Sequence, residues 1–198
     1  MSHAKNIVLA VLAGICIGIG GTVFLSVENP VIASALFSIG LISITIFKFN
    51  LFTGKLCFIL ENKAGYIIEL TEVWIGNFIG TALAALAIRF TRLDLYSVEF
   101  VEGKLNDNLL STFILAVFCG ILMYIAVIGY ARTKNYLLLI LPVMIFLLCG
   151  FEHCVGNMFY FSLCGVWNAE SVITLLVMTL GNLTGGLILQ IADKKIHS

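Results

Sequence analysis

Long apolar runs separated by short polar segments make up most of this chain. A helix that crosses a bilayer needs about 20 apolar residues, and six runs approach that length. The second and fifth runs are interrupted by polar residues or glycine, at 48–50 and at 150–153. The pattern predicts an all-α integral membrane protein with six transmembrane helices. Their expected positions are residues 7–27, 31–54, 67–88, 109–130, 136–163 and 171–191.

The composition agrees with this prediction. The 198 residues are 61% hydrophobic and 11% charged, whereas soluble domains are about half apolar and a quarter charged. The chain leaves no room for a separate soluble domain, so a single transmembrane domain over 1–198 is expected. Its net charge is zero and it has no basic run, which argues against a nucleic-acid partner. The six cysteines lack metal-binding or disulfide spacing, so no metal or other cofactor is expected.

The two halves of the chain share a motif and a plan. Gly76-Asn77-Phe78-Ile79-Gly80 in the third span recurs 105 residues later as Gly181-Asn182-Leu183-Thr184-Gly185 in the sixth. Each motif follows an interrupted span. Three spans followed by three place the halves, about 7–88 and 109–191, in opposite orientations. This predicts an inverted 3+3 repeat with broken helices two and five, a plan whose sites lie where the broken helices meet.

Lysine and arginine set the orientation, because cytoplasmic loops carry an excess of them. With a cytoplasmic N-terminus, seven lie in inner segments and three in outer ones, and Lys48 is left at membrane depth. This predicts a multi-pass protein of the cell (inner) membrane with both termini in the cytoplasm. The inner residues are Lys5, Lys55, Lys63, Arg132, Lys134, Lys194 and Lys195; the outer ones are Arg89, Arg92 and Lys104.

Residues 149–161 carry the strongest functional signal. They contain His153, the only histidine away from the termini, with Glu152 beside it and hydrocarbon on both sides. Ionisable side chains are costly at membrane depth and usually face a cavity. Backbone that breaks there must be buried in protein or line a cavity. The breaks near Thr53 and His153 are therefore expected to face one pathway, with Asn50 adding an amide. A histidine can change its charge near neutral pH.

Apolar side chains near the two breaks suggest gates. Phe37 and Leu41 are four residues apart and share one helical face, and Phe146 lies two turns before His153. With Leu51 and Phe52 these side chains can form apolar constrictions on either side of a polar centre. Such a gate opposes a bare anion far more than a neutral acid. The alternative for any one of them is a contact with lipid or a packing role.

Four glycine-rich segments, in this order, resemble the formate/nitrite transporter family, which conducts small monovalent anions such as formate, nitrite and hydrosulfide. The resemblance implies an aquaporin-like protomer, a homopentamer with one pore per protomer and no enzymatic activity. Its expected partners are a small anion, protons and the lipid bilayer. The segments that carry it are Ala13-Gly14-Ile15-Cys16-Ile17-Gly18-Ile19-Gly20-Gly21, Leu51-Phe52-Thr53-Gly54, Gly150-Phe151-Glu152-His153 through Asn157-Met158, and Thr179-Leu180-Gly181-Asn182-Leu183-Thr184-Gly185-Gly186.

The resemblance also implies roles for individual residues. His153 matches the central pore histidine, which shares a proton with the substrate, and Thr53 matches the threonine of the Ω-shaped loop in the second helix. Phe37, Leu41 and Phe146 match one constriction, and Leu51 and Phe52 contribute to the other. Lys104 matches a lysine whose charge favours anions. The residues expected to support the site from behind are Glu152, Asn157, Asn182, Asn50 and Lys48.

Two departures from the family pattern bear on selectivity. Gly120 stands where the family commonly has an asparagine in the fourth helix. Asn50 stands where an acidic residue usually precedes Leu-Phe-Thr, and Lys48 is two residues before it. The first break is therefore more cationic than expected, which fits an anion but leaves its identity open.

Two other functions are weighed against an anion channel. An aquaporin-like channel for neutral solutes needs two Asn-Pro-Ala-like turns, but only Asn29-Pro30 resembles one and it lies at the wrong place. A membrane-embedded enzyme or redox protein needs paired histidines or a complete metal site, and a lone Glu-His does not supply one.

Overall fold

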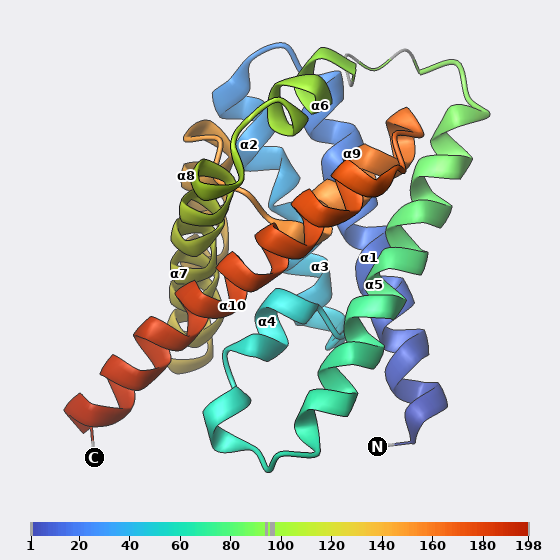
Figure 1. The fold of residues 1–198 in the computed structure, drawn as a ribbon. Coiled ribbons are helices and arrows are strands. Elements are labelled where there is room, and N and C mark those ends of the chain that lie inside the picture. The colour runs from blue at the N-terminus through green and yellow to red at the C-terminus, as the bar shows by residue number, and fades with distance from the viewer. Residues whose placement is uncertain (1, 94, 96–97, 198) are drawn as a thin grey trace.

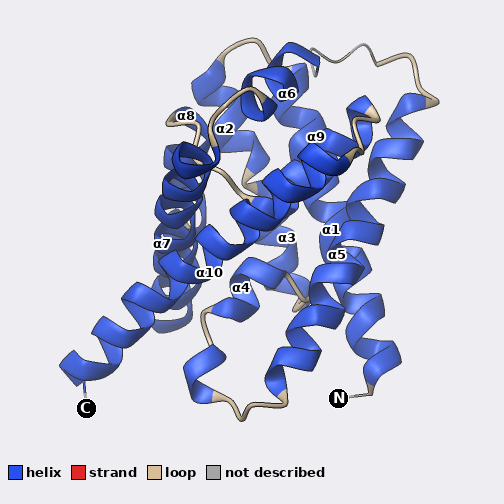
Figure 2. Cartoon of the chain, viewed as in Figure 1, coloured by secondary structure: helices blue, strands red, loops and turns tan. Residues whose placement is uncertain are grey.

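The computed structural model describes residues 2–93, 95 and 98–197, and all regular structure within them is helical (Figures 1 and 2). The described helices, in chain order, are α1 His3–Ser26, α2 Pro30–Phe37, α3 Ile39–Phe47, α4 Phe52–Leu56, the 3-10 helix η1 Ile59–Glu61, α5 Tyr66–Arg89, α6 Val98–Leu105, α7 Leu109–Thr133, α8 Leu137–Leu148, α9 Cys154–Cys164 and α10 Ala169–His197.

The helices account for the six expected spans. Five stretches of the described residues are long and apolar enough to cross a bilayer: α1, α2 with α3, α5, α7 and α10. The sixth span is α8 followed by α9, two shorter apolar helices on either side of residues 149–153. Helices two and five are therefore the broken ones, as the sequence predicts.

A bend divides the second span before its break. Ser38 ends α2, and its N–H donates to the carbonyl of Ala35 at 3.2 Å. The Ser38 hydroxyl contacts the carbonyls of Ser34 and Ile140, each at 3.5 Å. Serine hydroxyls that bond back to helix carbonyls commonly bend membrane helices. The sequence did not predict this bend, which lies one residue after Phe37.

Two closely packed helix pairs form the frame of the protein, α1 with α5 and α7 with α10. A Cβ atom on Gly80 would lie 2.1 Å from the carbonyl oxygen of Val11, and one on Gly185 would lie 2.0 Å from that of Val117. Only glycine allows backbones to approach this closely in lipid. The contacts correspond between the halves, so the shared Gly-Asn-x-x-Gly motif marks equivalent helix crossings.

The close approach also accounts for one departure from the family pattern. A Cβ atom on Gly120 would lie 2.3 Å from the carbonyl oxygen of Asn182. In the first half, a Cβ atom on Gly14 would lie 2.4 Å from the carbonyl oxygen of Asn77. An asparagine at 120 would push α7 away from α10, so glycine follows from the packing of this protein.

Both termini lie on one side of the molecule, and α6 lies on the opposite side (Figure 1). We call these the terminal side and the α6 side. Helix α6 falls within residues 89–108, which connect the third and fourth expected spans. Which side faces the cytoplasm stays a prediction. The boundaries of the two halves, 7–88 and 109–191, and the single domain over 1–198 stay predictions as well. Residues 1 and 198 lie outside the described residues.

Alanine at Gly185 should destabilise the protein, whereas alanine at the neighbouring Gly186 should not. A Cβ atom on Gly186 would have no other atom within 4 Å, and alanine is the better helix former by about 1 kcal/mol. Overpacking at Gly185 should cost about 1–3 kcal/mol. Thermal unfolding in detergent measures both; equal melting temperatures would contradict the proposed crossing.

Candidate functional site

The two breaks have the same backbone conformation. Lys48 directly follows α3 and Gly150 lies two residues after the end of α8, and their φ angles are 55° and 69°. Each is followed by a phenylalanine whose N–H bonds back into the helix, Phe49 to Ile44 at 2.9 Å and Phe151 to Phe146 at 2.8 Å. A positive φ is uncommon for residues other than glycine. Lys48 therefore occupies a position where the second half has glycine.

Two asparagines satisfy the backbone of the two breaks. The Asn77 side chain donates to the carbonyls of Ala10 and Asn50 at 2.8 and 2.9 Å, and its oxygen accepts the Phe52 N–H at 2.8 Å. Asn182 repeats this pattern with the equivalent residues of the second half. It donates to Ala116 and Glu152 at 2.8 and 2.7 Å and accepts the Cys154 N–H at 2.9 Å.

The breaks meet at His153 and Thr53. The Thr53 hydroxyl lies 2.9 Å from Nε2 of His153, and both side chains are buried. His153 also caps α9, because its Nδ1 accepts the Gly156 N–H at 3.0 Å. An acceptor nitrogen carries no proton, so the neutral ring has its proton on Nε2 and donates to Thr53. The ring of Phe146 stacks on the imidazole at 5.5 Å with a 10° interplanar angle.

A buried ion pair lies beside the histidine. Nζ of Lys104, on α6, donates to both oxygens of Glu152 at 2.9 and 2.8 Å, and lies 4.8 Å from the centre of the Phe100 ring. Nδ2 of Asn157 donates to Glu152 at 2.8 Å and to the His153 carbonyl at 3.0 Å. The structure thus brings Lys104 against Glu152, so its positive charge is balanced by a carboxylate.

The first break has a different polar network. Nδ2 of Asn50 donates to Asn6 at 2.7 Å, and Nδ2 of Asn6 donates to Glu72 at 2.8 Å. His3 contacts the other oxygen of Glu72. The carboxylate that Asn50 lacks is therefore supplied by Glu72 through Asn6. The sequence analysis missed this series of hydrogen bonds, although the acidic Glu72 within the third span was a signal for it.

A small cavity of about 30 Å³ lies on the α6 side of the centre. The Phe37 and Phe146 rings line it in an edge-to-face contact, with centres 6.2 Å apart. Lys104, His153 and Asn157 also line it. Leu41 is not among the described residues that line this cavity, and its grouping with the two phenylalanines stays a prediction.

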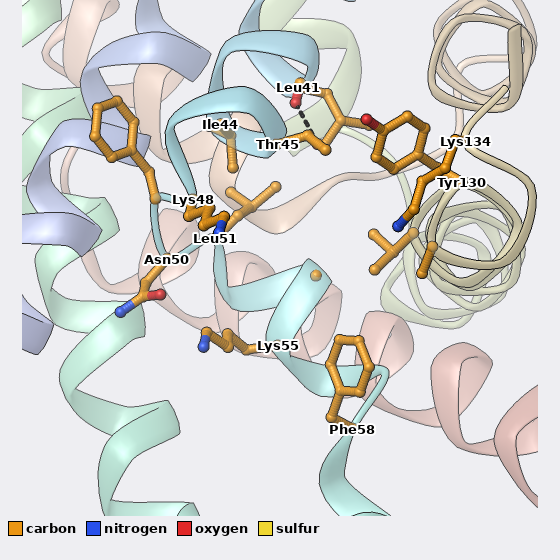
Figure 3. Close-up of a pocket in the computed structure, with 14 residues that line it drawn as sticks. Leu41, Ile44, Thr45, Lys48, Asn50, Leu51, Lys55, Phe58, Tyr130 and Lys134 are labelled. Atoms are coloured by element: carbon orange, nitrogen blue, oxygen red, sulfur yellow. Dashed lines mark hydrogen bonds between the residues drawn. The ribbon is translucent and has the colours of Figure 1, made fainter. Parts of the chain in front are cut away.

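A larger cavity of about 510 Å³ opens on the terminal side (Figure 3). Leu41, Leu51 and Asn50 are among the residues that line it. Phe52 is buried and its N–H is held by Asn77. Three lysines line the cavity, Lys48, Lys55 and Lys134, and no carboxylate is among its described lining residues. The sequence analysis singled out only the first of these three for the site.

Comparison with known proteins identifies the family. The family model for formate/nitrite transporters matches residues 1–192. The chain belongs to this family. It is thus a multi-pass membrane protein of a family of channels and transporters, and not an enzyme, in agreement with the sequence analysis.

Three curated relatives show the range of named activities. The formate channel FocB of Escherichia coli K12 is 25% identical, over 80% of this chain and 66% of FocB. The formate channel FocA of Haemophilus influenzae is 26% identical, over 81% of this chain and 71% of that protein. The nitrite transporter NirC of Salmonella typhimurium is 26% identical, over 91% and 78%. The chain therefore spans just under two thirds of FocB.

Two solved structures share the fold. An FNT family ion channel superposes with a TM-score of 0.89 at 22% identity, covering 98% of this chain and 90% of that one. A structure described as a pentameric formate channel with formate bound gives a TM-score of 0.84 at 26% identity, covering 98% and 97%. The all-helical fold of this protein is thus the fold of these channels.

Replacing Asn182 with leucine should destabilise this protein strongly, because it removes three hydrogen bonds to backbone groups that lipid cannot satisfy. Each buried group left without a partner costs about 1–3 kcal/mol, so a large fall in melting temperature is expected. Thr184→Val is the matched control on the same helix, because that hydroxyl bonds only to the Leu180 carbonyl one turn earlier. Similar losses in both variants would contradict the proposed role.

Proposed function

We propose that this protein is a channel or proton-coupled transporter for small monovalent weak-acid anions such as formate or nitrite, with His153 at the pore centre. The observation that carries the proposal is the Thr53–His153 hydrogen bond, which joins the two breaks between the two cavities. Relatives named as formate channels and nitrite transporters support the same substrate class. Of these anions, the observations favour none over the others.

The charge on the terminal side supports an anion. Lys48, Lys55 and Lys134 line one cavity without a lining carboxylate among the described residues. A cavity lined by one sign of charge raises the local concentration of oppositely charged solutes. An anion that enters it meets Leu41 and Leu51 before the centre, where partial dehydration is required.

The chemistry at the centre supports hydrogen-bond sharing with the substrate. Nε2–H of His153 points to the Thr53 hydroxyl, which can donate in turn to an anion that reaches the break. A fully protonated ring would lose the acceptor that caps α9 at Gly156. The arrangement therefore favours sharing of a hydrogen bond over complete proton transfer from an imidazolium.

The pore leaves the centre between Phe37 and Phe146 and passes the Lys104–Glu152 pair. We assign the constriction on the α6 side to the two phenylalanines and the one on the terminal side to Leu41 and Leu51, with Phe52 behind them. Asn50, Asn157 and Asn182 support the breaks from behind. We further propose a homopentamer, the assembly named for the solved formate channel, with both termini in the cytoplasm.

Replacing His153 with phenylalanine should abolish formate flux or reduce it strongly at both pH values, because the ring would keep its stack on Phe146 but lose both hydrogen bonds. Radiolabelled formate and nitrite uptake into proteoliposomes, at two pH values, measures this. Thr53→Val should reduce flux and Thr53→Ser should largely preserve it. Unaltered pH-coupled flux in His153→Phe would refute the central role. Stopped-flow swelling in urea or glycerol tests for the aquaporin-like alternative.

Replacing Lys48, Lys55 and Lys134 together with glutamine should slow anion entry from the terminal side. The effect should be several-fold at low ionic strength and should shrink in salt, since the Debye length falls to about 8 Å at 0.15 M. Lys5, Lys63 and Lys194 do not line this cavity among the described residues, so glutamine at those three is a charge-matched control. Equal effects of the two triple variants would contradict a role for the cavity.

A further inference from the structure

The large cavity on the terminal side carries more positive charge than one monovalent anion can balance. Lys48, Lys55 and Lys134 line it, and no carboxylate is among its described lining residues. Among the described residues, Lys104 and Arg132 each form an ion pair with a carboxylate, whereas none of these three lysines does. A single formate or nitrite would offset one charge and leave two.

Two of the three lysines adopt a backbone conformation that favours glycine. Lys48 and Lys134 have φ angles of 55° and 57°, and in the described part of the chain they are the only residues other than glycine with positive φ. They cap the C-terminal ends of α3 and α7. A side chain is strained in this conformation, and such strain gathers at functional sites. Glycine would fit both positions with less strain, which indicates that the ammonium groups have a use in the cavity.

The three lysines come from separate segments of the chain. Lys48 follows α3, Lys55 lies in α4 and Lys134 follows α7, and Figure 3 shows their side chains on the wall of one cavity. Nζ of Lys134 lies 5.6 Å from the centre of the Tyr130 ring. Lysine binds phosphate groups as a point charge. The fold therefore assembles a basic site from a sequence that has no basic run.

The cavity is also too large for a monovalent substrate alone. Its volume of about 510 Å³ compares with about 30 Å³ for the cavity on the α6 side, and ligand pockets commonly measure about 300–1,000 Å³. Three aromatic side chains line it, Phe49, Phe58 and Tyr130. Aromatic rings can stack on the flat face of a nucleobase. The cavity thus has room for an anion with several charges and for an attached ring.

Such an anion would not pass the centre of the molecule. Leu41 and Leu51 are apolar lining residues of the cavity, and beyond it the Thr53 hydroxyl lies 2.9 Å from Nε2 of His153. Moving several charges together past apolar side chains costs far more than moving one. A polyvalent anion that enters the cavity would therefore stay in it, in the path of smaller anions.

We propose that the large cavity is a binding site for a polyphosphate anion, held by Lys48, Lys55 and Lys134, and that the bound anion occludes the terminal end of the pore. A terminal phosphate group carries about 1.5–2 negative charges at pH 7, so two linked phosphates roughly balance three lysines. The occlusion rests on the proposed function, whereas the binding does not. Inorganic polyphosphates and nucleotides share this chemistry.

Isothermal titration of the purified protein in detergent, with inorganic pyrophosphate at low salt and without magnesium, measures the binding. Glutamine at Lys48, Lys55 and Lys134 together should weaken pyrophosphate binding about tenfold or more, since each exposed charge pair contributes roughly two- to fivefold. Glutamine at Lys5, Lys63 and Lys194 removes the same charge from residues outside the cavity among those described. This control should bind pyrophosphate as the wild type does.

Lys48→Gly separates a binding role from a structural one. Glycine relieves the strain at a φ of 55°, so the melting temperature should be unchanged or higher, while pyrophosphate binding should weaken about two- to fivefold. A lower melting temperature with unchanged binding would assign Lys48 to the fold and overturn its place in the site.

Comparison of ATP with inorganic tripolyphosphate distinguishes the two sources of the ligand. Tighter binding of ATP supports a site for nucleotides, in which the aromatic wall holds the base. Equal binding supports a site for inorganic polyphosphate. Weaker binding of both than of formate overturns the proposal.

Formate uptake into proteoliposomes, with pyrophosphate on both sides and ionic strength matched by gluconate, measures the occlusion. Wild-type flux should fall at least threefold, and the Lys48, Lys55 and Lys134 triple variant should lose its sensitivity to pyrophosphate. Lysine-dependent binding supports the site even if the wild type transports no formate, a result that would refute only the proposed function. No binding by the wild type, or equal binding by both triple variants, overturns the site. Binding that leaves wild-type formate flux unchanged overturns the occlusion.

Discussion

The need to satisfy backbone groups at two helix breaks inside a hydrocarbon layer governs this structure. Water is absent there, so each exposed N–H or C=O would cost several kcal/mol. Asn77 and Asn182 meet the need by bridging each break to a neighbouring helix through three hydrogen bonds. The glycines of the same motifs let those helices approach closely enough for the amides to reach.

The two halves of the inverted repeat therefore share the same backbone hydrogen bonds at their breaks, even where the side chains at equivalent positions differ. Asn50 and Glu152 stand at equivalent places, and each N–H bonds to a leucine carbonyl of the first helix of its half, at 3.2 and 3.4 Å. Their side chains differ, because only the backbone geometry is required by the fold. The same reasoning explains how Lys48 occupies the position equivalent to Gly150, at some conformational cost.

Because the side chains at the breaks can differ, the cavities on the two sides of the molecule differ in charge and size. The α6 side has a small cavity in which a lysine and a glutamate neutralise each other. The terminal side has a large cavity with three lysines, and the partly exposed carboxylate of Glu72 is linked to Asn50 through Asn6. The cavity on the terminal side is thus lined by charge of one sign, whereas the charges beside the small cavity are paired.

The sequence by itself determined the six spans, the two broken helices, the repeat and the family, because hydropathy and the glycine motifs encode these locally. It also identified Thr53 and His153 as partners, since opposite breaks of an inverted repeat must meet. Only the tertiary structure decided which side chains contact one another and which of them line a cavity. It placed Leu41 on the wall of the large cavity, paired Lys104 with Glu152, and linked Asn50 to Glu72 through Asn6. Such contacts join residues far apart in the chain, and in an apolar sequence no local pattern distinguishes a pore-lining side chain from one that packs in the core.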